Sequence, residues 1–146
     1  MPRRLTALAL LLLLAACASA QGLRPGADGA PPSGGMTMLY PQKPEAVLEA
    51  AIRSLPQIGL HVVEVDAGGK YLLAERGVNA MSNGENVGVY LAPSGTGTSV
   101  TVLSRRKTAT NIGAKDFTMP VHMQLGATLG RLGQPNQAGQ PALPRY

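Results

Sequence analysis

Two turn sequences, Ala67–Gly69 and Pro93–Gly97, constrain the fold of this chain more than any other feature. Each separates two runs of β-forming residues, Leu60–Asp66 from Lys70–Arg76 and Val87–Leu91 from Thr98–Arg105. Glycine-rich turns between runs rich in valine, or runs that alternate apolar and polar residues, are typical of β-hairpins. Two adjacent hairpins predict four strands in an antiparallel sheet with one buried face.

A helix is expected on each side of these strands. Pro44–Leu55 begins with a proline that suits the first helical position, and Leu48, Ala51, Ile52 and Leu55 follow at i, i+3, i+4 and i+7. In the second segment, Asp116–Leu132, apolar residues recur every four positions, and Pro120 fits only the first turn. Those residues are Phe117, Val121, Leu125 and Leu129, with Leu132 three positions further on. Gly126 and Gly130 either weaken the helix by about 1 kcal/mol each relative to alanine or permit close packing on the sheet.

The expected fold is therefore α+β, a two-layer sandwich of helix, four antiparallel strands and helix, with both helices on one sheet face. This domain spans residues 44–132. Before it we expect a signal peptide at 1–16 and a flexible linker at 17–43, rich in glycine, proline and alanine, and after it a disordered tail at 133–146. Met36–Tyr40 is mildly apolar, and it either docks as an edge strand or remains part of the linker.

The N-terminus has the composition of an export signal. Arg3 and Arg4 precede Leu5–Ala16, an apolar run of about twelve residues, which is shorter than the roughly 20 that a transmembrane helix needs. Without these two arginines the chain has 11 basic residues against 8 acidic ones, so its net charge falls from +5 to +3. This modest charge, with 3% aromatic residues and no tryptophan, disfavours nucleic acid as a partner.

Leu14-Ala15-Ala16-Cys17 contains the chain's single cysteine. The four residues resemble the lipobox of bacterial lipoproteins. The resemblance implies cleavage before Cys17, a diacylglycerol on its thiol and an acyl chain, typically palmitate, on its amine. Ala18 is similar to the residue that follows the cysteine in outer-membrane lipoproteins facing the periplasm. An alternative is ordinary cleavage after Ala18-Ser19-Ala20, which would release a soluble periplasmic protein.

A second resemblance covers Leu55–Asp66 and Tyr71–Glu75, with the glycine turn between them. This pattern is similar to one found in small envelope lipoproteins of uncharacterised function. It also resembles the repeated domains of an accessory lipoprotein of the outer-membrane barrel-assembly machine. The resemblance implies a small α+β domain.

The sequence contains no recognisable catalytic or metal-binding pattern. His61 and His122 are the only histidines, and they show no metal-ligand spacing; Cys17 is the single cysteine, so no cysteine pair could complete a metal site. None of the serines lies in a G-x-S-x-G turn, which would mark a hydrolase nucleophile. We therefore expect no enzyme, no metal and no cofactor. The expected function is a protein-interaction module that contacts an unidentified envelope protein. The alternative is a module that binds a small ligand or lipid on the sheet face between the helices, and the sequence indicates no oligomeric state.

One basic cluster stands out, formed by Arg105, Arg106, Lys107 and Lys115. Such a cluster is predicted either to contact anionic lipid headgroups or an acidic partner, or simply to mark the solvated end of a strand.

Overall fold

A computed structural model describes residues 22–79 and 82–132 of the chain. The expected signal peptide, Cys17 and the expected tail lie outside these residues. The strands are β1 (Met36–Tyr40), β2 (His61–Val65), β3 (Tyr71–Arg76), β4 (Glu85–Ser94) and β5 (Gly97–Arg106). The helices are α3 (Pro44–Ser54), the 3-10 helix η2 (Leu55–Ile58) and α4 (Thr118–Leu132).

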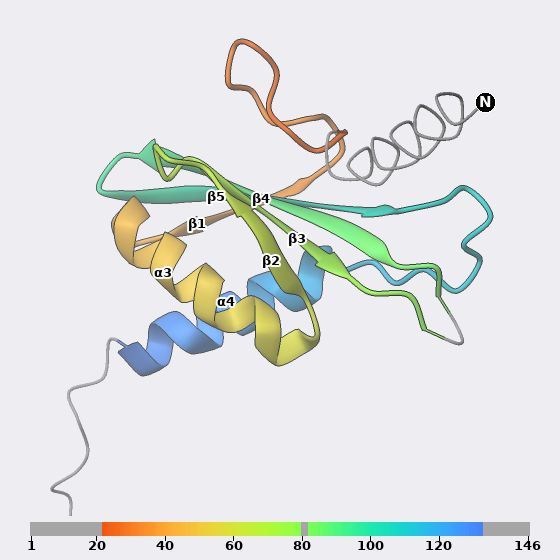
Figure 1. Ribbon diagram of the computed structural model, residues 1–146. Helices are drawn as coiled ribbons and strands as arrows, with labels where there is room; N and C mark the ends of the chain where they lie inside the picture. The colour runs from red at the N-terminus through yellow and green to blue at the C-terminus, as the bar shows by residue number, and fades with distance from the viewer. Residues whose placement is uncertain (1–21, 80–81, 133–146) are drawn as a thin grey trace, which may run out of the picture.

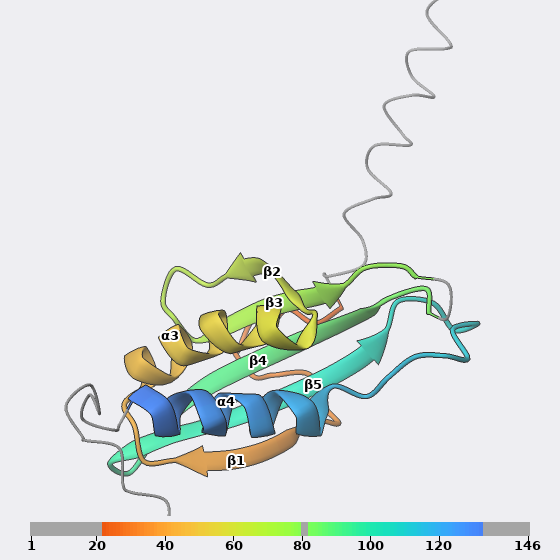
Figure 2. The same ribbon diagram turned by 90° about the horizontal axis from the view of Figure 1, so that it is seen from below.

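The described residues form one antiparallel five-stranded sheet in the order β1-β5-β4-β3-β2. Both helices cover one face of this sheet, and Figure 1 shows them as a single layer. Seen from the helix side in Figure 2, α4 lies over β5 and beside β1, whereas α3 lies over β3 and β4. The α+β class and the placement of both helices on one face are thus confirmed.

Turn chemistry explains both expected hairpins. At the first turn the Asp66 carboxylate accepts hydrogen bonds from the backbone N–H groups of Gly68 and Lys70, both at 3.1 Å. Gly69 adopts φ of +68°, a conformation that costs glycine nothing. At the second turn Gly95 has φ of +58°, and β4 and β5 pair without interruption from Glu85↔Arg106 to Ser94↔Gly97.

The main core lies between the sheet and the helices, and α3 faces it differently from the expectation. Of the expected residues, Ala51 and Leu55 are buried, Leu48 is only partly buried and Ile52 is exposed. The buried residues of α3 itself are Val47, Ala50, Ala51 and Ser54. The buried residues also follow the spacing i, i+3, i+4 and i+7, so the sequence contained two candidate faces one residue apart. Small alanines in the buried face let the helix backbone approach the sheet.

The second helix matches its predicted core face. Phe117, Val121, Leu125 and Leu129 are all buried; the side chain of Leu132 is not among those described. Of the two expectations for Gly126 and Gly130, close packing on the sheet was wrong, because both are exposed and a Cβ at either would meet no atom within 4 Å. They therefore do not bring α4 closer to the sheet.

The expected linker overlaps the folded domain. β1 adds a fifth strand by pairing with β5 from Met36↔Val102 to Tyr40↔Thr98, so the domain begins before Pro44. Further upstream, Leu23 is 2% exposed, and it packs with residues of the sheet's helix-free face. Figure 1 shows the segment before β1 on the side of the sheet opposite the helices. A Gly/Pro-rich composition thus did not prevent Leu23 and β1 from joining the folded domain.

Candidate interaction surfaces

The helix-free face of the sheet has a small core of its own. Leu23 inserts among Leu73, Tyr90 and Leu103, with Tyr71 packed beside them. The Tyr90 hydroxyl donates a hydrogen bond to the Leu23 carbonyl oxygen. Burial raises the pKa of Tyr90 to about 12, so this hydroxyl stays a donor over the whole physiological range.

Gly88 makes room for the Tyr90 side chain. A Cβ at position 88 would lie 2.2 Å from the Tyr90 oxygen and 2.6 Å from its Cζ atom, far inside van der Waals contact. The two residues point to the same face because they are two positions apart on β4. Glycine therefore lets the Tyr90 ring lie along the strand and reach Leu23.

An ion pair fastens the same N-terminal segment to the edge strand β2. The Arg24 guanidinium donates to Glu64 Oε2 from Nη2 at 2.9 Å and from Nε at 3.1 Å. The Tyr71 hydroxyl donates to Glu64 Oε1 at 2.8 Å. The hydrogen bond from Arg24, followed by that from Tyr71, lowers the pKa of Glu64. Leu23 and Arg24 thus attach neighbouring positions of the chain to the helix-free face.

The basic cluster expected from the sequence is divided in space. Arg105 donates to the carbonyl oxygens of Gly22 and Ser33, at 3.5 and 3.4 Å, so it serves the N-terminal segment. Lys107 pairs with Glu75 at 2.7 Å. Arg106 and Lys115 line a polar hollow of about 280 Å³ together with Asp116, whose carboxylate offsets their charge.

A buried carboxylate organises the loops at one end of the sheet. Glu85 is fully buried; its Oε1 accepts from the Ser82 hydroxyl at 2.6 Å and from the Lys115 backbone N–H at 3.0 Å. Its Oε2 lies 3.3 Å from Arg76 Nε, which is within ion-pair distance but outside hydrogen-bond geometry. Asn111 donates to Ser82 Oγ at 3.1 Å. The network thus joins β3, β4 and the loops that carry Ser82, Asn111 and Lys115.

The two histidines differ in their surroundings. His61 is exposed on β2. His122 is 3% exposed on α4, where Nδ1 lies 2.9 Å from the Tyr40 hydroxyl and Nε2 lies 3.1 Å from the Met36 carbonyl oxygen. Among the described residues no group of three or more His, Cys, Asp or Glu side chains is placed to hold a metal ion.

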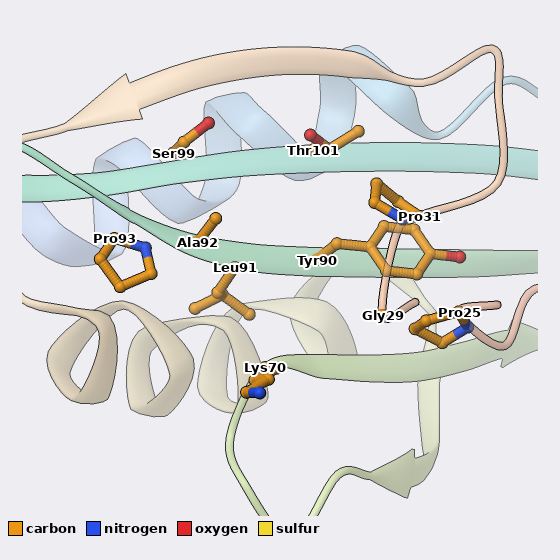
Figure 3. Close-up of a pocket in the computed structure, with 10 residues that line it drawn as sticks. All are labelled: Pro25, Gly29, Pro31, Lys70, Tyr90, Leu91, Ala92, Pro93, Ser99 and Thr101. Atoms are coloured by element: carbon orange, nitrogen blue, oxygen red, sulfur yellow. The ribbon is translucent and has the colours of Figure 1, made fainter. Parts of the chain in front are cut away.

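A shallow apolar hollow of about 230 Å³ lies on the helix-free face (Figure 3). Its walls include Pro25 and Pro31 of the N-terminal segment, the Tyr90 ring and Lys70 at the start of β3. Pockets for small organic ligands usually measure about 300–1,000 Å³. The space between the helices and the sheet, where a ligand site was the alternative expectation, is filled by the main core.

The two edges of the sheet differ in their protection. β2 carries a charged residue, Glu64, and its register with β3 shifts between Val62 and Glu64. A bulge and a charge both discourage pairing with a further strand. β1 has no charged residue, no proline and an unbroken register with β5, and its residue Leu39 is 72% exposed. Over the described ranges, β1 is therefore the less protected edge.

Methionines flank the β1 edge on the helix side. Met36 is 37% exposed and Met119 is 43% exposed. Met119 lies one turn before His122, the α4 residue whose ring is within hydrogen-bonding distance of the Met36 carbonyl oxygen. Flexible methionine side chains adapt to varied partner surfaces. Leu39, Met36 and Met119 together are called the β1-edge surface below.

None of the helices that the structure describes is both long enough and apolar enough to cross a membrane.

No protein-family profile matches the chain, and no curated protein matches it. Among solved structures, the chain is similar to that of Ara h 8.0201, with 10% sequence identity and a TM-score of 0.44. The match covers 68% of this chain and 95% of the other.

Proposed function

We propose that this protein is a lipoprotein anchored through Cys17 to the periplasmic side of the outer membrane, where its domain binds another envelope protein without catalysis. The lipobox and the export signal support the anchor. The ion pairs of Glu85, Glu64 and Lys107 with residues of the same chain support a structural use of these charges, and the exposed β1 edge supports a binding role. The partner contributes a β-strand to the β1 edge of the sheet.

The unprotected β1 edge carries this proposal. An edge strand presents backbone N–H and C=O groups that an extended segment of a partner can pair with. The β1-edge surface then supplies apolar contacts on both faces of the strand, Leu39 on the helix-free face and Met36 with Met119 on the helix face. The opposite edge β2 offers Val63, which is 48% exposed, but its bulge and Glu64 interrupt the strand.

Site-specific photo-crosslinking in bacterial membranes tests the edge. A benzophenone amino acid replaces Leu39 in one variant and Val63 in a matched variant on the opposite edge. We expect a discrete crosslinked protein adduct from position 39 and a much weaker one from position 63. Equal adducts, or none from position 39, would overturn the strand-addition proposal.

A charge at the same position provides a second test. Leu39→Lys places a protective charge on β1 without removing a core contact, and Val63→Lys does the same on β2. We expect Leu39→Lys alone to abolish co-purification of the partner from solubilised membranes.

The intact mass of the mature protein tests the anchor separately. An unmodified N-terminus at Gln21 would rule out the lipoprotein and favour the soluble periplasmic alternative.

A further inference from the structure

The N-terminal segment is attached to the sheet only a few residues after the proposed anchor. Leu23 is buried among Leu73, Tyr90 and Leu103, and its carbonyl oxygen accepts from the Tyr90 hydroxyl. Arg24 adds the ion pair to Glu64 at 2.9 Å. The domain thus holds the chain at residue 23. The free spacer after Cys17 therefore ends at residue 23, well before residue 43, where the sequence predicted that it would end.

The covalent length of the chain limits the remaining tether. An extended chain spans at most about 3.3–3.6 Å per residue, so the six residues from Cys17 to Leu23 reach roughly 20 Å. The 26 residue steps from Cys17 to Lys43, the length of the expected linker, would have reached roughly 90 Å on the same scale. This upper limit holds for any conformation of the residues between the anchor and the attachment point.

We propose that the helix-free face of the sheet, together with residues 22–33, faces the phospholipid surface to which Cys17 is anchored. This inference rests on the proposed lipidation of Cys17. The helices lie on the opposite face, so the sheet separates them from the attachment point of the tether (Figure 1). The short tether favours orientations in which the helix-free face is nearest the bilayer.

The composition of this face is compatible with a lipid surface. Arg24, Lys70 and Arg105 lie on it, with Asp28 and Glu64 opposing their charge. The net charge is small, so attraction to anionic headgroups adds little, at most about 1 kcal/mol for each unbalanced charge. The proposed orientation therefore rests on the short length of the tether, and the charges of this face do not disfavour contact with the lipid surface.

Tryptophan fluorescence tests the orientation, because the chain has no tryptophan of its own. Residues 17–146 are coupled through the Cys17 thiol to a maleimide lipid in phosphatidylcholine vesicles that contain phosphatidylglycerol and a headgroup spin label. Single tryptophans replace Ser33 on the helix-free side or Met123, which is 69% exposed on α4. We expect spin-label quenching several-fold stronger for Ser33→Trp than for Met123→Trp.

A longer tether provides the matched control. Inserting about twenty Gly and Ser residues between Gln21 and Gly22 restores a flexible spacer and leaves the Leu23 contacts intact. The difference in quenching should then disappear. Equal quenching at the native length, or stronger quenching of Met123→Trp, overturns the proposed orientation.

The design separates this inference from the function on which it rests. Chemical coupling supplies the anchor at Cys17 whether or not cells lipidate it. A protein found unlipidated in bacterial membranes would therefore overturn the lipoprotein assignment, while the vesicle measurement would still decide how the domain sits on a six-residue tether.

Discussion

The Tyr40 hydroxyl lies 2.9 Å from Nδ1 of the buried His122 ring. On the other side of the ring, Nε2 lies 3.1 Å from the Met36 carbonyl oxygen. A carbonyl only accepts, so Nε2 carries a proton and Nδ1 of the neutral ring is an acceptor for the Tyr40 hydroxyl, which also lies 3.2 Å from the His122 carbonyl oxygen. Burial lowers the pKa of His122, which favours this neutral form. The ring thus joins both ends of the edge strand β1 to α4.

Acidification is predicted to weaken the domain through this ring. The unfolded chain binds a proton at His122 near the ordinary pKa of 6.5, whereas the folded domain does so only at lower pH. The contribution of His122 to the free energy of unfolding should therefore fall as pH drops below about 6.5 and stay level above it. Urea unfolding at several pH values measures this. His122→Gln should remove the decline between pH 6.5 and the lowered pKa of His122, and His61→Gln, at an exposed position, should retain it.

Gly88→Ala should destabilise the helix-free face. The added methyl would lie 2.2 Å from the Tyr90 oxygen, so the ring must move away from Leu23. Overpacking of this kind typically costs about 1–3 kcal/mol. Gly126→Ala is the control, because nothing lies within 4 Å and alanine favours the helix by up to about 1 kcal/mol. Equal stability of the two variants would contradict the packing described for Tyr90.

Leu23→Ala should lower the free energy of unfolding by about 2–5 kcal/mol, as for other buried leucines. Leu39→Ala makes the same substitution at an exposed position and should change the free energy of unfolding by less than about 0.5 kcal/mol. Thermal and urea unfolding compare the two. If both variants matched the unsubstituted protein, residue 23 would contribute nothing to the fold.

Glu85→Ala should be the most damaging of the charge substitutions. It would leave Arg76, the Ser82 hydroxyl and the Lys115 backbone N–H without their acceptor, and removing one partner of a buried ion pair costs about 3–5 kcal/mol. Glu49→Ala breaks the exposed pair with Arg53 on α3 and should cost about 0.5 kcal/mol or less. The ratio between these two losses, measured by urea unfolding, tests whether burial sets the strength of the pair.

Sequence reasoning recovered the parts of the fold that local chemistry determines. The turns at Asp66–Lys70 and Pro93–Gly97 predicted both hairpins, and the four-residue spacing from Phe117 to Leu129 predicted the core face of α4. The face of α3 was assigned correctly at Ala51 and Leu55, which are buried, and wrongly at Ile52, which is exposed. Hydrophobicity favoured Leu48 and Ile52, whereas packing on the sheet buries Val47, Ala50 and Ser54.

The attachment of Leu23 to the helix-free face could not be predicted from the sequence pattern. Leu23 is a single apolar residue in a Gly/Pro-rich segment, and its binding site comes from residues 50–80 positions further along the chain. Hydrophobic periodicity reflects neighbours in the sequence, so it does not indicate a contact between residues this far apart in the chain. The division of the basic cluster followed from a simpler rule, since neighbouring residues on a strand point to opposite faces and Arg105 and Arg106 therefore separate.

The Leu23 attachment also implies an order of events for a protein exported N-terminus first. Leu23 leaves the translocation channel well before Leu73, Tyr90 and Leu103, which form its binding site. In the exported lipoprotein that we propose, no folded sheet would hold Leu23 during that interval, so the enzymes that modify and cleave at Cys17 would meet an accessible substrate. Completion of the sheet would then attach Leu23 and end this period of free access.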